Sequence, residues 1–217
     1  NAITVEIGEG GIRLIRITDN GGGIGREDVP TAFLRHATSK LRTPQDLAAI
    51  GTAETVHAAT RGENITVIFI NNAIYGMTGG QMAPTSLPNQ VTQTSPYGRD
   101  VSKAGYPVRV CELLSTLDGP AYIERVTVDC KKNIRKAKNA IKKAFQYQID
   151  GVGYSFIEVV STCPTNWGLT PQEAFEWMRE NMLPYYPLGV YRDVVADGYA
   201  NAAEAASARS AACPIAH

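Results

Sequence analysis

The chain has 217 residues, of which 44% are hydrophobic and 19% charged, a composition that suits one globular domain or a domain with an attached fragment. Its 21 Lys and Arg residues balance 21 Asp and Glu, which excludes a global field that would gather nucleic acid or an anionic membrane. No apolar run approaches the roughly 20 residues that cross a bilayer, and the N-terminus lacks a signal-peptide pattern. We therefore expect a cytoplasmic protein with no membrane partner, and no nucleic-acid partner for its main domain.

The N-terminal region has the pattern of a β-hairpin. Residues Ile3 to Ile7 and Ile12 to Ile17 alternate apolar and polar side chains on either side of a glycine-rich turn. A short helix is predicted over Asp28 to Arg35, because acidic residues and Pro30 suit a first helical turn. These elements predict a small α+β fragment made of a hairpin and a helix.

The next segments predict a helix, a buried strand and a long loop. Leu47 to Thr60 is helical in propensity and ends at Arg61-Gly62. Ile65 to Ile70 is a continuous β-branched and aromatic run, which predicts a core strand buried on both faces of a parallel sheet. Asn71 to Arg99 shows no periodicity, and loops of this length are usually functional or disordered.

Strands and helices alternate in the rest of the chain, which predicts an α/β fold with a mostly parallel sheet flanked by helices. Thr170 to Glu173 forms a capping box that opens a helix through Met182. The helix predicted over Asn133–Ile149 has a basic face, which indicates either solvated surface or a nucleic-acid patch, and solvated surface is favoured. The other predictions are strand into helix over Val108–Leu117, a strand over Ala121–Val128, a helix over Asn133–Ile149, a strand over Tyr154–Val160, and an Ala-rich tail over Val194–His217, partly helical or disordered.

Four cysteines are widely spaced and form no CxxC pair, which argues against a metal or cluster site built from this chain alone. Two of them, Cys111 and Cys130, are predicted to be small buried hydrophobic side chains. The full set is Cys111, Cys130, Cys163 and Cys213.

The N-terminal region contains two motifs, Asp19-Asn20-Gly21-Gly22-Gly23-Ile24 and Arg35-His36-Ala37-Thr38-Ser39-Lys40. With these motifs, residues 1 to about 52 resemble the ATP-binding domain of the MutL mismatch-repair family. The resemblance implies that Asp19 contacts the adenine, that Gly21 and Gly23 shape a lid turn, and that Thr38, Ser39 and Lys40 lie near the nucleotide. The family's general-base Glu and Mg²⁺-binding Asn are expected before Asn1, and Gly51 to Glu54 replaces its phosphate loop. We therefore expect no ATP hydrolysis.

The apolar strand followed by Asn71-Asn72 and Ala73 to Gln81 carries a second resemblance. Residues 46 to 193 resemble the thiamine-diphosphate-binding β subunit of 2-oxoacid:ferredoxin oxidoreductases, in the branch that acts on 2-oxoglutarate or branched-chain 2-oxoacids. Further segments that support it are Pro96–Asp100, Leu117–Gly119, Cys163–Gly168 and Pro187–Asp193.

This second resemblance implies a thiamine-diphosphate-binding fold, N-terminally truncated, that binds the cofactor with Mg²⁺. The side chain of Asn72 and the backbone carbonyl of Ile74 would be metal ligands, because Mg²⁺ prefers oxygen. Tyr75, Gly76, Met77 and Thr78 would wrap the diphosphate. The reaction implied is oxidative decarboxylation of a 2-oxoacid to an acyl-CoA, with an α subunit, a γ subunit in some members, and ferredoxin as partners. The alternative interpretation is a plain glycine-rich surface connection.

Two departures bear on activity. The family's Gly-Asp-Gly triplet falls at Thr43-Pro44-Gln45, so Pro44 stands where a third Mg²⁺ ligand is expected and offers no side-chain oxygen. A cysteine-rich motif expected nearer the N-terminus is also absent. Cys163 matches a remaining cluster ligand, but one thiolate cannot hold the [4Fe–4S] cluster of the intact family. We expect the isolated chain to be inactive.

The two resemblances meet at Asp46 to Thr52, a stretch that fits both patterns. The sequence therefore predicts an apparent chimera with a MutL-like fragment at 1–45, a thiamine-diphosphate-binding domain at 46–193 and a tail at 194–217. Three hypotheses stay open at this point: an oxidoreductase subunit or remnant, a MutL-like nucleotide-binding module, and a non-catalytic chimera.

Overall fold

The computed structural model describes residues 3–8, 14–19 and 44–211, with side chains from residue 52 onward. The chain divides into two compact units, Asn1–Leu47 and Ala48–His217. In the first unit, β1 (Ile3–Gly8) pairs antiparallel with β2 (Leu14–Asp19), with Ile3 opposite Asp19 and Gly8 opposite Leu14. The predicted hairpin is confirmed. The predicted helix over residues 28–35 lies outside the described residues.

The second unit is built on a four-stranded sheet of order β3-β5-β4-β6. The first three strands run parallel and β6 runs antiparallel to β4, which confirms the predicted mostly parallel sheet. The bounds are β3 Thr66–Asn71, β4 Pro120–Thr127, β5 Tyr154–Val160 and β6 Gly189–Asp193.

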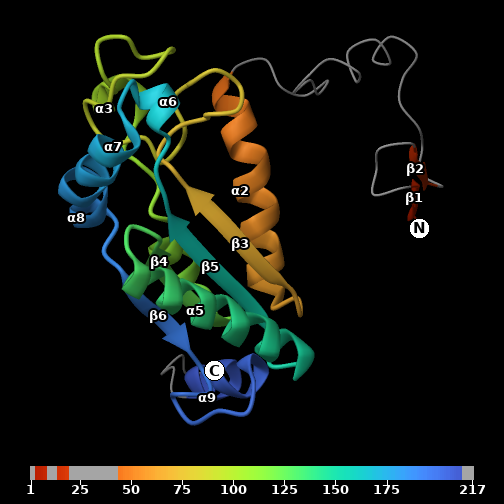
Figure 1. Cartoon of the computed structure of the whole chain (residues 1–217). Coiled ribbons are helices and arrows are strands. Elements are labelled where there is room, and N and C mark those ends of the chain that lie inside the picture. The colour runs from red at the N-terminus through yellow and green to blue at the C-terminus, as the bar shows by residue number, and fades with distance from the viewer. Residues whose placement is uncertain (1–2, 9–13, 20–43, 212–217) are drawn as a thin grey trace. The chain divides into compact units, whose positions relative to one another are not determined.

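Helices cover both faces of this sheet (Figure 1). Small and aromatic side chains of α5 pack against β4 and β5 on one face, and α2 and α4 pack on the other. A third apolar cluster, around Met178 and Met182, lies at the carboxyl end of β5. The helix bounds are α2 Pro44–Arg61, α3 Val101–Ala104, α4 Val110–Ser115, α5 Lys131–Ile149, α6 Pro164–Trp167, α7 Pro171–Trp177, η2 Met178–Met182, α8 Leu183–Tyr185 and α9 Ala202–Ala211.

The central strand of the sheet is β5, and the prediction that residues 65–70 form the strand buried on both faces is wrong. Every residue of β5 is buried, whereas β3 lies at the edge of the sheet. Ile68 and Ile70 are 40% and 56% exposed. The reason is that α5 lies over β4 and β5 and leaves the same face of β3 largely uncovered.

Two further sequence predictions differ in detail from the structure. Residues 108 and 109 form no strand, so the predicted strand into helix over Val108 to Leu117 contributes only the helix α4. The capping box at Thr170 and Glu173 is present, and the predicted helix to Met182 forms, but its last five residues adopt a π-helix, η2. The Ala-rich tail contains α9, whose Ala202 and Ala205 are buried against the sheet's main apolar cluster.

Asp193 joins the end of β6 to α5. Its carboxylate forms an ion pair with Lys143, accepts a hydrogen bond from the Tyr147 hydroxyl at 2.7 Å, and accepts one from the Ala196 amide at 3.2 Å. Burial alone would raise the pKa of Asp193, but the hydrogen bonds from Lys143 and Tyr147 outweigh it, so the pKa lies below its usual value. Asp193 is therefore a stabilising anion at neutral pH.

We expect Asp193→Asn to lower the free energy of unfolding at pH 7 by about 1–3 kcal/mol, since a charged hydrogen-bond acceptor is lost. Because the folded-state pKa is depressed, the stabilisation is present above the unfolded value near 3.9 and is lost as pH falls through the folded-state pKa. Urea unfolding at pH 7 and at acidic pH measures both effects. Asp197→Asn, at an exposed aspartate of the same turn, is the control. A difference between Asp193→Asn and wild type that persists unchanged at acidic pH would contradict the assignment.

Candidate cofactor site

The site is built on the turn that follows β3. Asn71, the last residue of this strand, is buried; its side-chain amide donates to Glu158 Oε1 at 2.8 Å, and its Oδ1 accepts from the Ala73 amide at 3.1 Å. Asn72 is half-buried, and its Oδ1 accepts from the Ile74 amide at 3.4 Å. Because β3, β4 and β5 are parallel, this turn lies at the carboxyl edge of the sheet, where open α/β sheets bind their ligands.

A tight glycine-containing loop follows, and its own backbone closes it. The Tyr75 amide donates to the Gln81 carbonyl at 3.0 Å, and the Gly80 amide donates to the Tyr75 carbonyl at 2.9 Å. The Thr78 hydroxyl also donates to Gln81 Oε1, and Gln81 Nε2 donates to the Thr78 carbonyl at 2.8 Å. Within the described part of the chain, no group accepts a hydrogen bond from the amides of residues 76, 77 and 78. Three successive uncommitted amides suit an anion.

Gly76 lies against the short helix α6. A Cβ at this position would stand 2.8 Å from Cys163 Sγ and 3.2 Å from Asn166 Nδ2, so only glycine fits without rearrangement. The Asn166 amide donates to the Gly76 carbonyl at 3.1 Å and to Cys163 Sγ at 3.2 Å. The structure thus brings Cys163 to the predicted diphosphate loop. It also brings Asn166 there, a residue whose individual role could not be predicted from the sequence.

The remainder of the long loop is held by one buried arginine. Arg99 is 4% exposed, and its guanidinium donates to backbone carbonyls on two segments of chain. Each of its three nitrogens has at least one such acceptor, which lowers the cost of burying the cation. The acceptors are the carbonyls of Ala83, Pro84, Ser86, Ala104 and Gly105. The long loop, for which the sequence analysis left function and disorder open, is therefore ordered.

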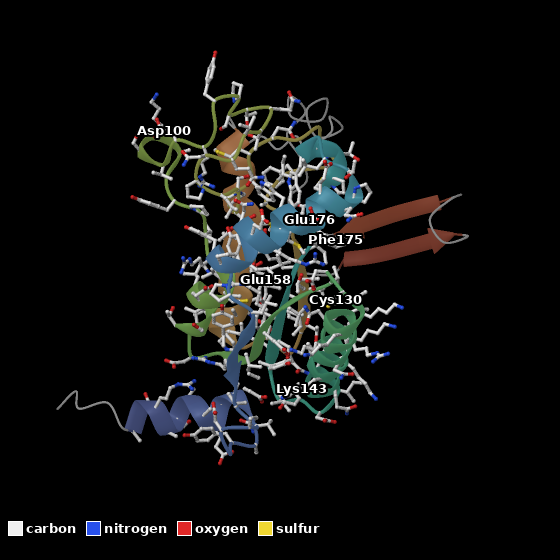
Figure 2. The ribbon with its side chains drawn as sticks, turned by 60° about the vertical axis from the view of Figure 1, so that its left-hand side comes forward. Asp100, Cys130, Lys143, Glu158, Phe175 and Glu176 are labelled. Atoms are coloured by element: carbon white, nitrogen blue, oxygen red, sulfur yellow. The ribbon has the colours of Figure 1, made fainter. Side chains whose placement is uncertain are left out.

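Beneath the turn, charged side chains form a buried network. Arg125 donates to Glu158 at 2.8 Å and to Glu112 at 2.5 Å, and the side chains of Arg125 and Glu158 are fully buried. Figure 2 shows Glu158 in the middle of the unit. Burial alone would raise the pKa of Glu112, but the Arg125 hydrogen bonds and charge hold this pKa below its usual value. The network continues through Glu158 to Asn71, so it links the sheet interior to the candidate site.

The three described cysteines differ in their burial. Cys111 is buried, and burial beside Glu158 raises the pKa of its thiol. Cys130 is exposed at the start of α5, so the prediction that it is buried is wrong, because this residue caps a surface helix. Cys163 is half-buried. Among residues 52–211, no group of three or more His, Cys, Asp or Glu side chains is placed to hold a metal ion.

The alternative nucleotide site falls almost wholly outside the described residues. Asp19 is the last residue of β2. The remaining predicted nucleotide-site residues, Gly21, Gly23, Thr38, Ser39 and Lys40, lie in a range that the structure does not describe. Separately, none of the described helices is long and apolar enough to span a membrane.

Many known proteins are similar to parts of this chain, and two of them represent its two resemblances. Subunit VorA of the ketoisovalerate oxidoreductase of Methanothermobacter marburgensis is 49% identical over 174 residues, which cover 80% of this chain and 35% of VorA. The chain therefore spans about a third of the length of this relative. A short segment is 63% identical over 49 residues to the DNA mismatch repair protein MutL of Agathobacter rectalis, covering 23% of this chain and 8% of MutL. Both predicted resemblances are confirmed at the level of sequence.

A solved structure has the same fold. The 2-oxoglutarate:ferredoxin oxidoreductase from Magnetococcus marinus, with 2-oxoglutarate, coenzyme A and succinyl-CoA bound, superposes with a TM-score of 0.51 at 18% sequence identity. The superposition covers 78% of this chain and 60% of that chain. Residues 46–159 match the family described as thiamine pyrophosphate enzyme, C-terminal TPP binding domain, in which thiamine pyrophosphate is another name for thiamine diphosphate. The chain belongs to the thiamine pyrophosphate enzyme family, through this C-terminal cofactor-binding domain.

Proposed function

We propose that this chain is the cofactor-binding portion of a 2-oxoacid:ferredoxin oxidoreductase β subunit, and that it binds thiamine diphosphate with Mg²⁺ through residues 72–78. The observation that carries the proposal is the row of three uncommitted amides at residues 76–78, presented by a loop that its own hydrogen bonds close. Family membership and the similarity to VorA support the same choice of ligand.

The donor set of the turn fits a hard cation. Asn72 Oδ1 has only a long hydrogen bond to the Ile74 amide, and no described residue donates to the Ile74 carbonyl. Amide and carbonyl oxygens are ligands that Mg²⁺ accepts. Asn72 and Ile74 would therefore bind the metal, while Tyr75, Gly76, Met77 and Thr78 would surround the diphosphate. When bound, the cofactor supplies the carbanion that attacks the 2-oxo carbon of the substrate.

We expect Pro44→Asp to strengthen Mg²⁺-dependent cofactor binding by about tenfold, since the resemblance places a carboxylate ligand there and a ligand oxygen contributes roughly 1.4 kcal/mol or more. Pro44 is the first residue of α2, where an acidic residue is also compatible with the helix. Titration calorimetry compares the two proteins. Pro171→Asp, at the first position of α7, is a matched control. An unchanged affinity in Pro44→Asp would show that the register of the resemblance is wrong.

The substrate of the proposed enzyme is a 2-oxoacid, and its partners are an α subunit and ferredoxin, in the cytoplasm. VorA carries the name of an oxidoreductase subunit, which supports a multisubunit assembly. Cys163 is proposed as one ligand of an iron–sulfur cluster whose other ligands come from elsewhere. Turnover is proposed to require the complete assembly, while cofactor binding resides in this chain.

Replacement of Asn72 tests the proposed function. We expect Asn72→Ala to weaken Mg²⁺-dependent binding of thiamine diphosphate at least tenfold in calorimetric titrations of the full chain. Asn139→Ala, at an exposed asparagine of α5, should bind as the wild type does. Equal affinities for the wild type and Asn72→Ala would overturn the assignment of the metal turn.

The MutL-like segment favours a second candidate function, a nucleotide-binding module. Its support is the 63% identity over 49 residues. We expect any binding of an ATP analogue to depend on Asp19, whose carboxylate would accept from the adenine amine. Unchanged analogue binding by Asp19→Ala would contradict this second candidate. Transcript reads that end within the segment encoding residues 46–52 would instead favour a non-catalytic chimera.

A further inference from the structure

The residue between the two proposed metal ligands has an unusual backbone. Ala73 has a φ of +54°, in the left-handed region that residues with a Cβ rarely adopt, and it is fully buried. A residue held there costs on the order of 1–3 kcal/mol, and such residues concentrate at functional sites. Because Ala73 joins Asn72 to Ile74, its backbone angles set the direction of one ligand relative to the other.

Side chains from elsewhere hold both polar groups of this residue. The Ala73 amide donates to Asn71 Oδ1 at 3.1 Å. Its carbonyl accepts two hydrogen bonds, from Ser86 Oγ at 2.6 Å and from Gln90 Nε2 at 3.0 Å. All three partners are buried, so water does not compete for these bonds.

The side chains that hold Ala73 are themselves held by further hydrogen bonds. Ser86 Oγ accepts from the Ala83 amide at 2.9 Å, and Gln90 Oε1 accepts from the Leu87 amide at 2.8 Å. Each of these two side chains therefore has its donor free for Ala73 and cannot turn away without losing a second bond. On the opposite side, Asn71 is oriented by Glu158.

We propose that Ser86 and Gln90 are positioning residues for the metal site: they hold Ala73 in its left-handed conformation and so preorganise Asn72 and Ile74 for one cation. This inference rests on the proposed function. It assigns a role to two buried polar side chains in a loop whose other contacts stabilise the fold. Preorganisation lowers the free-energy cost of ordering the turn when the cation binds.

The test uses the full chain with Mg²⁺ titrated at a fixed concentration of thiamine diphosphate. Ser86→Ala and Gln90→Met each remove one of the two hydrogen bonds donated to the Ala73 carbonyl. Ser86→Ala also removes the acceptor of the Ala83 amide, and Gln90→Met removes the acceptor of the Leu87 amide. Each should weaken Mg²⁺ binding about tenfold while urea unfolding shows a folded protein. Ser95→Ala is the control, because among the described residues the only hydrogen bond of its hydroxyl is donated to the Met82 sulfur in the same loop. If one variant does not fold, the other carries the test.

Rescue distinguishes positioning from general support of the fold. Glycine adopts a positive φ without strain, so adding Ala73→Gly to either variant should restore most of the lost Mg²⁺ affinity, although a buried methyl group is removed. Affinity that stays low in both double variants would overturn the inference, as would wild-type affinity in both single variants. Absence of Mg²⁺-dependent cofactor binding in the wild type would overturn the proposed function and this inference with it.

Discussion

Arg125→Met is expected to lower the free energy of unfolding by about 3–5 kcal/mol, because it leaves the fully buried Glu158 carboxylate without its cation. Arg125 also donates to Glu112 on α4 and, at 2.5 Å, to the Tyr191 hydroxyl on β6. A single side chain thus joins β4 to two other strands and a helix. Urea unfolding monitored by circular dichroism measures the loss.

Two matched variants separate burial from charge. Arg179→Met breaks the ion pair with Asp129, in which the Arg179 side chain is 43% exposed, and should cost less than about 1 kcal/mol. Adding Glu158→Gln to Arg125→Met should recover part of the stability, because the uncompensated charge is removed while Asn71 keeps its acceptor. A loss in Arg125→Met no larger than that in Arg179→Met would show that the network is not stabilising.

Gly76→Ala is expected to weaken binding of thiamine diphosphate about tenfold or more. The new methyl group would stand 2.8 Å from Cys163 Sγ, so either the thiol or the diphosphate loop must move. Overpacking of this kind typically costs about 1–3 kcal/mol. The cost should appear in cofactor affinity, because the loop that shifts carries the amides of residues 76–78.

The companion variant for this prediction is Cys163→Ala. It removes the sulfur atom and leaves Asn166 Nδ2 as the nearest atom to the new methyl group, at 3.2 Å, so Gly76→Ala with Cys163→Ala should regain most of the affinity. Calorimetry on the two single variants and the double variant gives the coupling directly. Additive effects of the two substitutions would mean that the thiol does not constrain the loop.

Much of the fold could be predicted from periodicity. The amphipathic pattern of residues 133–149 and the capping box at Thr170 are local signals, and α5 and α7 follow them. Burial was harder to predict. The apolar runs of β3 and β5 look alike in sequence, but which strand occupies the centre depends on where α5 packs, and that is a tertiary property.

The candidate site was also predictable only where local sequence determines it. The Asn71-Asn72 pair and the glycine loop could be found from their sequence, since they directly follow an apolar strand. Ser86, Gln90 and Asn166 carry no local signal, because their roles arise from contacts across the folded loop, such as the bond from Asn166 to Gly76. The left-handed φ of Ala73 could not be predicted either, since alanine does not favour it.

Calorimetric titration of thiamine diphosphate into the full chain, in Mg²⁺ and then in excess EDTA, shows whether the loop after β3 binds the cofactor through a metal ion. The loop after β3 should give saturable binding in Mg²⁺ and little or none in EDTA, because in the proposed site the metal as well as the amides of residues 76–78 would bind the diphosphate. Absence of heat at millimolar cofactor, or equal binding in EDTA, would contradict the account.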